Sequence, residues 1–369
     1  MNSFKCERKP DSLLAVGVVG AIVAAAYVLL ILFRHGFDPS IMLALGEDAP
    51  SQTAYAERML GRDVVVREFL GHDGKFFFIQ ANDPWILDPM EHAAFLDRPL
   101  YRSQRMLYPM LAGGFGSFTA SVIVYSMVGI NIVAVGIGSA TTARLAQATG
   151  ASRWLGLAFC FNPGVLGELD IGGGGVVALS LGMAGLLALQ RRAFGWAFVG
   201  MGGSVLARET MVLFVVGAAF GYWLATRQIS LKLALIPTFA ALAWRTYASF
   251  QLGPVGNPGA SADAVAYNLS SYPLEGLALS FRTWVEDPGR FTWTFCLILL
   301  MLMFGRRALK SRNAIGWSGV PILFLAAMLS ENVWREPYDI ARAVAPIFTI
   351  YAVLLFASGP RSSGKHMFD

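Results

Sequence analysis

The stretch LLAVGVVGAIVAAAYVLLILF, residues 13–33, is an unbroken apolar run of 21 residues, and it decides the class of fold. At 1.5 Å per residue a helix over this run is about 31 Å long, which matches the hydrocarbon core of a bilayer. The run is longer than the apolar core of a secretory signal peptide, and Lys5, Arg8 and Lys9 precede it. We therefore expect a retained first transmembrane helix.

The composition extends this reading to the whole chain of 369 residues. Hydrophobic residues make up 55% and charged residues only 14%, whereas a soluble domain carries about 25% charged residues. The other apolar runs have the length of helices and lack the alternation of barrel strands. We expect an all-α, polytopic membrane protein with a single domain over residues 1–369. The net charge of +5 lies in short clusters between the apolar runs, so no nucleic-acid partner is expected.

The apolar runs predict about 10 transmembrane helices and one long loop. Residues 34–105 form the loop, the first extracytoplasmic segment, and residues 358–369 form a disordered cytoplasmic tail. The expected spans cover residues 13–33, 119–143, 154–168, 175–190, 194–207, 210–225, 231–249, 291–305, 314–329 and 343–357.

The distribution of charge orients these spans. With the N-terminus in the cytoplasm, the four internal cytoplasmic loops contain Lys and Arg but no Asp or Glu, as the positive-inside rule requires. Because the number of expected spans is even, the C-terminus is also expected in the cytoplasm. Residues 106–118 are also apolar, but a full crossing there would invert every later loop. We expect them to lie at the outer surface or to dip into it.

Asp73, in HDGKFFF (residues 72–78), is the first candidate for chemistry. A partly desolvated carboxylate at a membrane surface is suited to act as a general base. The alternative is that Asp73 caps a helix beginning near Lys75. Phe76, Phe77 and Phe78 are expected to hold the loop against the outer leaflet. His72 is expected to be a polar neighbour, because no two of the four histidines have metal-ligand spacing.

Arg102 and Arg105 lie three residues apart in YRSQRMLYP (residues 101–109), so a helix places them on one face. They either bind a lipid phosphate or extend to the interface, with Tyr101 and Tyr108 in an aromatic belt. Arg245, near the outer end of a span, is open to the same two interpretations.

Two further pairs of charged residues lie in predicted outer segments. Arg208 and Glu209 interrupt an apolar stretch in LARET, where they form either a functional pair or a simple ion pair at a helix junction. Glu168 and Asp170 precede four glycines, and two nearby carboxylates suit a divalent cation or the orientation of an acceptor hydroxyl. The glycines at 172–175 lack the Lys and Ser/Thr of a phosphate-binding loop.

The last outer segment, ENVWREPYDIARAVAP (residues 331–346), contains five charges. Asp339 and Arg342 lie three apart and share a face at a helix start, where helix amides and a positive side chain favour phosphate. A solvated loop is the alternative. The five residues are Glu331, Arg335, Glu336, Asp339 and Arg342.

Taken together, HDGKFFF, YRSQRMLYP, LARET and YDIARAVAP resemble bacterial polytopic proteins of the GT-C glycosyltransferase superfamily, distantly similar to polyprenol- or dolichol-phosphate-mannose mannosyltransferases. Many relatives have Tyr where this chain has His72. The resemblance implies an enzyme of the bacterial inner membrane. It would move a sugar from a polyprenyl phosphate to a lipid, glycan or protein acceptor outside the cytoplasm, among membrane lipids.

The resemblance also implies roles for individual residues. Asp73 matches the catalytic base. The donor phosphate would be bound by Arg102, Arg105, Arg208 and Arg342, and the acceptor or supporting groups would be His72, Glu168, Asp170, Glu209, Arg335 and Asp339. No metal ligand is assigned, and a divalent cation is the only cofactor considered.

A second class of function uses the same features differently. A lipid or solute transporter predicts a polar path across the whole bilayer. A non-catalytic partner in envelope assembly predicts that Asp73 tolerates substitution. The glycines at 172–175 favour this class, because small residues allow close helix packing or a hinge.

Overall fold

The computed structural model describes residues 11–68, 71–257, 263 and 267–356, and this part of the chain is all-helical, as expected. Three of its helices are long and apolar enough to cross a membrane: α1 (Asp11–Arg34), α7 (Ala120–Ala148) and α15 (Pro288–Ser311). The apolar run that opens the chain is thus a single continuous helix. The predicted tail, residues 358–369, lies outside the described residues.

The other apolar runs form shorter, interrupted or bent helices. Four apolar segments have fewer residues than a straight span needs. A fourth crossing is available if α19 and α20 are one span, although they meet at a bend of 64°. The short segments are α9 (Gly175–Gln190), α10 (Phe194–Ala207), α11 (Met211–Thr226), and α16 (Ala314–Ser318) with α17 (Val320–Met328). The bent pair is α19 (Pro337–Ala343) and α20 (Ala345–Leu355). The longer helix α12 (Lys232–Leu252) follows α11.

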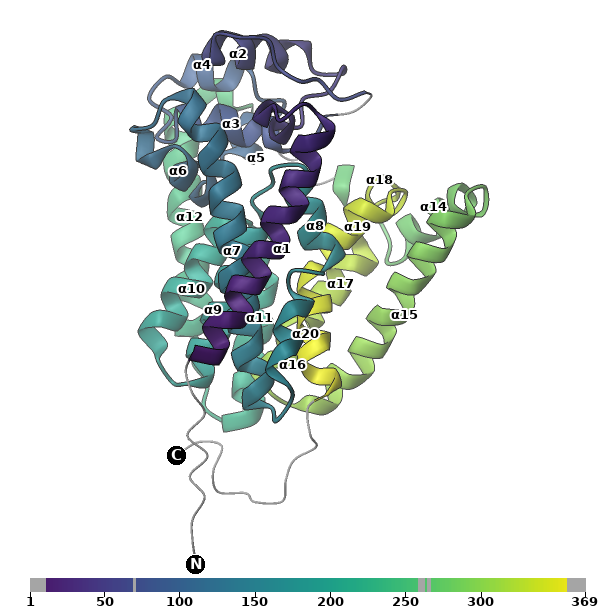
Figure 1. Ribbon diagram of the computed structural model, residues 1–369. Coiled ribbons are helices and arrows are strands. Elements are labelled where there is room, and N and C mark those ends of the chain that lie inside the picture. Colours follow the sequence, from purple (N-terminus) through teal and green to yellow (C-terminus); the bar gives the residue numbers. More distant parts are fainter. Residues whose placement is uncertain (1–10, 69–70, 258–262, 264–266, 357–369) are drawn as a thin grey trace, which may run out of the picture.

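A cap of short helices covers one end of α1 and α7 (Figure 1). It consists largely of the predicted loop, residues 34–105, and is well structured. Its elements are η1 (Pro39–Leu43), α2 (Pro50–Leu60), α3 (Gly74–Asn82), α4 (Pro89–Ala94) and α5 (Pro99–Arg102), followed by α6 (Leu107–Ala112) and η2 (Gly114–Gly116). The remaining elements are η3 (Arg153–Ala158), α8 (Pro163–Asp170), η4 (Gly253–Gly256), α14 (Glu275–Val285) and α18 (Glu331–Trp334).

The six-residue helix α6 occupies much of the ambiguous segment 106–118. It packs against α3, α7 and α10, and at about 9 Å it is far too short to cross a bilayer. The segment is therefore a short helix packed beside longer ones.

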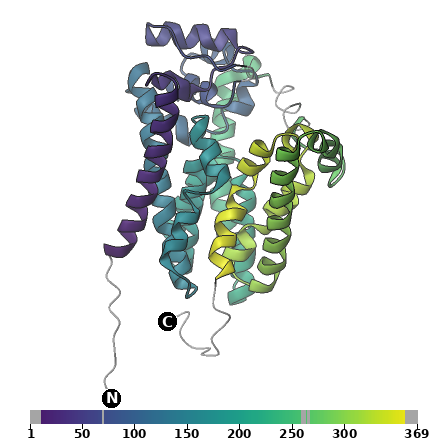
Figure 2. The same cartoon turned by 45° about the vertical axis from the view of Figure 1, so that its right-hand side comes forward.

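The first residue of α1 and the last residue of α20 lie at the end opposite the cap, in both Figure 1 and Figure 2. The long helices α1 and α7 pack closely against each other. Gly17 and Gly136 face each other across these two helices, where an added Cβ on Gly17 would lie 3.0 Å from the Gly136 carbonyl oxygen. Small residues at such a contact let two helix backbones approach closely.

The core beneath the cap corrects one expectation. Phe76, Phe77 and Phe78 are buried within the protein, so the prediction that they rest on the outer leaflet is wrong. The hydrophobic face of α3 packs against α6 and α7 instead.

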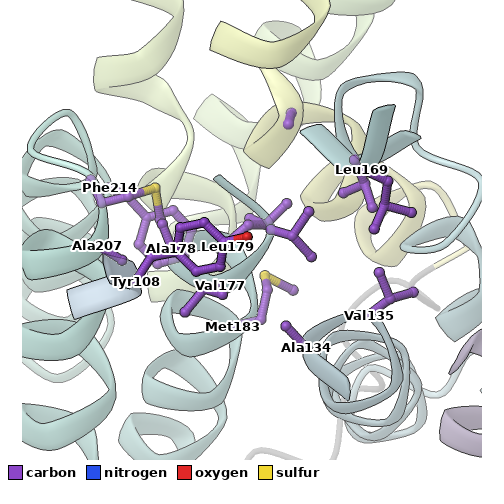
Figure 3. Packing of buried hydrophobic residues seen from close by; sticks show 14 of the residues in the cluster. Tyr108, Ala134, Val135, Leu169, Val177, Ala178, Leu179, Met183, Ala207 and Phe214 are labelled. Atoms are coloured by element: carbon purple, nitrogen blue, oxygen red, sulfur yellow. The ribbon is translucent and has the colours of Figure 1, made fainter. Parts of the chain in front are cut away.

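Tyr108 likewise does not belong to an aromatic belt. It is fully buried beside α9, near Val177 and Ala178 (Figure 3). Its hydroxyl donates to the Met127 carbonyl oxygen and accepts from the Asn131 side-chain amide. A buried phenol needs such partners, and here they tie α6 to α7.

Candidate functional site

Asp73 lies immediately before α3, where the cap meets the bundle. Its side chain makes no capping hydrogen bond to the helix, so the alternative reading as a helix cap is not supported. Gly74 allows this position, because a Cβ there would collide with the backbone oxygens of Ile171, Leu43 and Met42. The chain therefore presses directly against the end of α8, and the Asp73 carboxylate points into a group of arginines.

Three arginines surround the Asp73 carboxylate, whose side chain is 21% exposed. Arg102 Nη1 lies 2.7 Å from Oδ1, and Arg342 Nη2 lies 3.0 Å from Oδ2. Arg105 Nη1 lies 3.5 Å from Oδ2. The arginines come from α5, the turn after it, and α19, so the site joins the cap to the end of the chain.

These charges determine the protonation state of Asp73. Burial by itself raises the pKa of this carboxyl, but the positive charges of Arg102, Arg342 and Arg105 outweigh it and hold the pKa far below its usual range. Asp73 is therefore a carboxylate at neutral pH. In this arrangement it is also a weak base.

Each of the two cap arginines has a second carboxylate partner. Asp97 accepts hydrogen bonds from Arg102 Nε at 2.8 Å and Nη2 at 3.0 Å, and the Arg102 guanidinium lies 4.1 Å from the centre of the Phe76 ring. Glu209 binds Arg105 through Nε and Nη2, both at 2.8 Å. Only 15% and 12% of these two side chains is exposed, so they do not extend to the interface as free cations.

Arg342 is the centre of the bundle side of the site. Its Nε lies 3.0 Å from Glu168 Oε1, and its Nη1 lies 3.1 Å from Asp339 Oδ1. The Arg342 side chain is only 9% exposed. The helical spacing that suggested Asp339 and Arg342 as a pair is thus confirmed, and the solvated-loop alternative is wrong for Arg342.

Glu168 explains two of the four glycines. Its carboxylate accepts from Arg208 Nη1 at 2.9 Å and from the Gly175 amide at 3.1 Å. A Cβ on Gly173 or Gly175 would overlap this carboxylate. Gly173 and Gly175 therefore make room for a buried Glu–Arg pair at the start of α9.

We refer to nine residues as the charge cluster. They are four arginines and five carboxylates, drawn from the cap, the α10–α11 junction, α8 and α19: Asp73, Asp97, Arg102, Arg105, Glu168, Arg208, Glu209, Asp339 and Arg342. The sequence predicted a catalytic, binding or supporting role for eight of the nine, Asp73 among them. Only Asp97 was not predicted. Asp97 precedes Arg102 by five residues, a separation with no helical periodicity to reveal the pair.

Other predicted residues lie beside the cluster. Asp170 forms an ion pair with Arg67, at 2.9 Å. The sequence did not indicate Arg67 as a partner, because 103 positions separate the two residues. The His72 ring lies 5.8 Å from the Tyr338 ring, and burial and the charge of Arg342 lower the pKa of His72, so that it is neutral.

Two predicted arginines lie on the surface. Arg335 pairs with Glu331 at 2.7 Å, and its side chain is 48% exposed, so it does not support the charge cluster as expected. Arg245, in α12, is exposed, which fits its interpretation as an interfacial side chain.

Hydrogen bonds of Ser103 support the two cap arginines. His92 Nε2 lies 3.1 Å from Ser103 Oγ, whereas His92 Nδ1, 3.7 Å from Asp83 Oδ2, makes no hydrogen bond. The Ser103 carbonyl oxygen accepts from Trp244 Nε1 at 2.6 Å. Ser103 lies between Arg102 and Arg105 in the sequence, so these bonds hold the arginine pair against α4 and α12.

Arg208 and Arg342 line a small cavity of about 20 Å³, large enough for one water molecule. A second hollow is an open apolar groove of about 360 Å³ between α10 and α12, and no residue of the charge cluster lines it. The groove is lined by Trp85, Met106, Leu206, Ala240, Ala243, Trp244 and Tyr247.

The predicted cation site at Glu168 and Asp170 has a different arrangement. The two carboxylates bind different arginines, Glu168 with Arg208 and Arg342, and Asp170 with Arg67. Within the described ranges, no three His, Cys, Asp or Glu side chains are grouped as a metal site would require. In comparisons with known proteins, no protein-family model, no curated protein and no solved structure matches this chain.

Proposed function

We propose that this protein is an integral membrane glycosyltransferase of the GT-C type. It moves a sugar from a polyprenyl-phosphate donor to an acceptor hydroxyl, with inversion at the anomeric carbon and Asp73 as general base. The observation that carries the proposal is the convergence of one carboxylate and three arginine side chains, from positions up to 269 residues apart, at the edge of an apolar bundle.

The reaction has simple requirements. The acceptor oxygen forms a bond to the anomeric carbon while the bond from that carbon to the phosphate oxygen breaks. A carboxylate takes the hydroxyl proton, and positive groups stabilise the phosphate that leaves. Asp73 supplies the first group, and Arg102, Arg105 and Arg342 supply the second. Arg208 reaches the same region through Glu168.

The apolar groove between α10 and α12 offers a place for the hydrocarbon chain. Met106 in the groove follows Arg105 directly, and Leu206 is two residues before Arg208. A lipid in the groove would therefore present its phosphate to the arginines. The outward side of α12 is apolar, with Leu235, Phe239 and Leu242 exposed, so a lipid can reach the groove from the bilayer.

The proposal includes the finer topology. About ten crossings, several of them short or bent, would place both termini in the cytoplasm and the charge cluster at the extracytoplasmic face of a bacterial inner membrane. The acceptor is a lipid, glycan or protein, and the sugar is a hexose such as mannose.

A second candidate function has one observation in its favour. Every arginine of the charge cluster is paired with a carboxylate of the same cluster, which is also what a purely structural lock between cap and bundle would require. A transporter or a non-catalytic assembly protein fits that arrangement.

One comparison tests the two functions. Envelope glycolipids and glycans are measured by mass spectrometry in a deletion strain, and in the same strain expressing wild type, Asp73→Asn or the control Asp38→Asn, whose carboxylate binds Arg62 outside the charge cluster. We expect a sugar-bearing species to disappear on deletion and to return with wild type and Asp38→Asn, but not with Asp73→Asn at equal protein level. Full restoration by Asp73→Asn would remove Asp73 as the base and favour the structural or transport role.

A further inference from the structure

We propose that Asp73 occupies an anion site formed by Arg102, Arg105 and Arg342, and that a lipid phosphate binds there by displacing the Asp73 carboxylate. The identity of the ligand rests on the proposed function. The displacement itself rests on the way the three guanidinium groups are held.

Each of the three arginines is fixed by carboxylates other than Asp73. Arg102 uses Nε and Nη2 on Asp97, and Arg105 uses Nε and Nη2 on Glu209. Arg342 uses Nε on Glu168 and Nη1 on Asp339. Planar guanidinium groups held through two of their nitrogens cannot turn easily. The three arginines therefore stay in place when Asp73 leaves.

The nitrogens that remain all point to one position. They are Arg102 Nη1, Arg105 Nη1 and Arg342 Nη2, at 2.7, 3.5 and 3.0 Å from the Asp73 carboxylate oxygens. Two carboxylate oxygens serve three donors poorly, since the 3.5 Å separation is longer than a good charge-assisted hydrogen bond. A terminal phosphate has three oxygens and matches three donors. The donor is a phosphodiester with two free oxygens, and the phosphate that the reaction releases has three, so the three donors gain one further acceptor as the leaving group departs.

Displacement also changes the state of Asp73. While the arginines bind it, their charges hold its pKa far below its usual range. Once a phosphate takes their hydrogen bonds and neutralises their charge, the carboxylate becomes a stronger base. The base is therefore idle without a donor and active with one.

The decisive experiment measures affinity for farnesyl phosphate, using the purified full-length protein in detergent micelles. Wild type, Asp73→Asn and Asp38→Asn are compared, with inorganic phosphate and farnesol as further probes. Asp38→Asn is the matched control, because it makes the same charge change at a carboxylate bound to Arg62, outside the charge cluster. Removing the competing carboxylate is expected to raise the affinity of Asp73→Asn for farnesyl phosphate by about tenfold, the size of one charge-assisted hydrogen bond. Asp38→Asn should bind as wild type does.

The outcomes separate this inference from the proposed function. Equal or weaker binding by Asp73→Asn than by wild type overturns the displacement and leaves the lipid-phosphate donor standing. If no form binds farnesyl phosphate, both fail. Inorganic phosphate binding to Asp73→Asn as tightly as farnesyl phosphate would overturn the lipid part, and farnesol binding as tightly would overturn the phosphate part.

A measurement on wild type covers the case in which Asp73→Asn does not fold. An apolar carbodiimide reacts with a carboxyl that takes up a proton, and the labelled peptide is identified by mass spectrometry. We expect farnesyl phosphate to increase labelling of Asp73 severalfold, whereas farnesol leaves it unchanged. Protection of Asp73 by farnesyl phosphate would contradict the proposal.

Discussion

Arg342 Nη2 lies 3.0 Å from Asp73 Oδ2, although 269 residues separate them along the chain. Arg342 also contacts Glu168 and Asp339, so one side chain joins the cap, α8 and α19. Because a buried guanidinium is stable only while it is paired, this contact couples the position of the cap to the end of the chain.

Removing Arg342 should destabilise the protein strongly. Arg342→Ala leaves Glu168, whose side chain is 4% exposed, with one arginine fewer, and a broken buried pair costs about 3–5 kcal/mol. Arg335→Ala is the control, since its pair with Glu331 is on the surface and is worth about 1 kcal/mol or less. Thermal unfolding of the two purified variants measures the difference, and equal melting temperatures would argue against a structural role for the Arg342 network.

Gly175→Ala should disrupt the Glu168 pair. The added Cβ would lie 2.5 Å from Glu168 Cδ and 2.8 Å from Arg208 Nη1, so one of these side chains must move. Gly202→Ala, in α10, meets nothing within 4 Å and is expected to stabilise by about 0.5–1 kcal/mol, because alanine favours a helix interior. Thermal unfolding should move in opposite directions for the two variants. A shift of the same sign for both would contradict the steric explanation.

Filling the apolar groove should weaken lipid binding selectively. Ala243→Trp places a large ring in the groove of about 360 Å³ and should lower the affinity for farnesyl phosphate by about tenfold, the loss of roughly two buried methylenes. Phe239, on the outer side of α12, is 72% exposed. Phe239→Trp enlarges this side chain outside the groove and should leave the affinity for farnesyl phosphate unchanged. If both variants bind farnesyl phosphate as wild type does, the hydrocarbon chain lies elsewhere.

The cap should lose stability in acid through Asp38. A side-chain hydrogen bond from Arg62 lowers the pKa of Asp38 from 3.8 to about 2. A carboxyl with a lowered folded-state pKa stabilises the fold above its unfolded pKa, and that stabilisation is lost as the pH falls through the folded value.

The test for Asp38 is the difference in melting temperature between wild type and Asp38→Asn. It should be constant at neutral pH and should shrink only between about pH 4 and pH 2. Arg62→Gln should give the same profile, because it removes the other half of the pair. A difference that changes near neutral pH would point to a different titrating group.

Much of the helical arrangement follows from local sequence. The run at 13–33 is one helix because consecutive apolar residues of this length satisfy their backbone within the helix and their side chains in an apolar surrounding. Most of the shorter runs are helical where the sequence predicts, but the expected span 154–168 divides into η3 and α8, and the bends were not predicted. Pro346 lies directly after the break between α19 and α20, yet the 64° angle depends on what packs against both helices.

The roles of the aromatic residues in the cap could not be read from the sequence. Three consecutive phenylalanines are equally stable in lipid and in a protein core, because both surroundings are apolar. Only the packing of α3 against α6 and α7 shows that Phe76, Phe77 and Phe78 are in the core.

By itself, the sequence determined that this chain is all-helical and has the apolar helices of a membrane protein. It also singled out the few charged residues that lie among apolar neighbours as candidates for the site. Composition and the length of apolar runs are local properties, so they can be read directly from the sequence. The tertiary structure alone decided the pairing: Asp73 with three arginines, Glu168 with Arg208 and Arg342, and Arg335 with none of them. Ion pairs form over about 3 Å in space, and the chain brings together residues from its beginning, middle and end to make them.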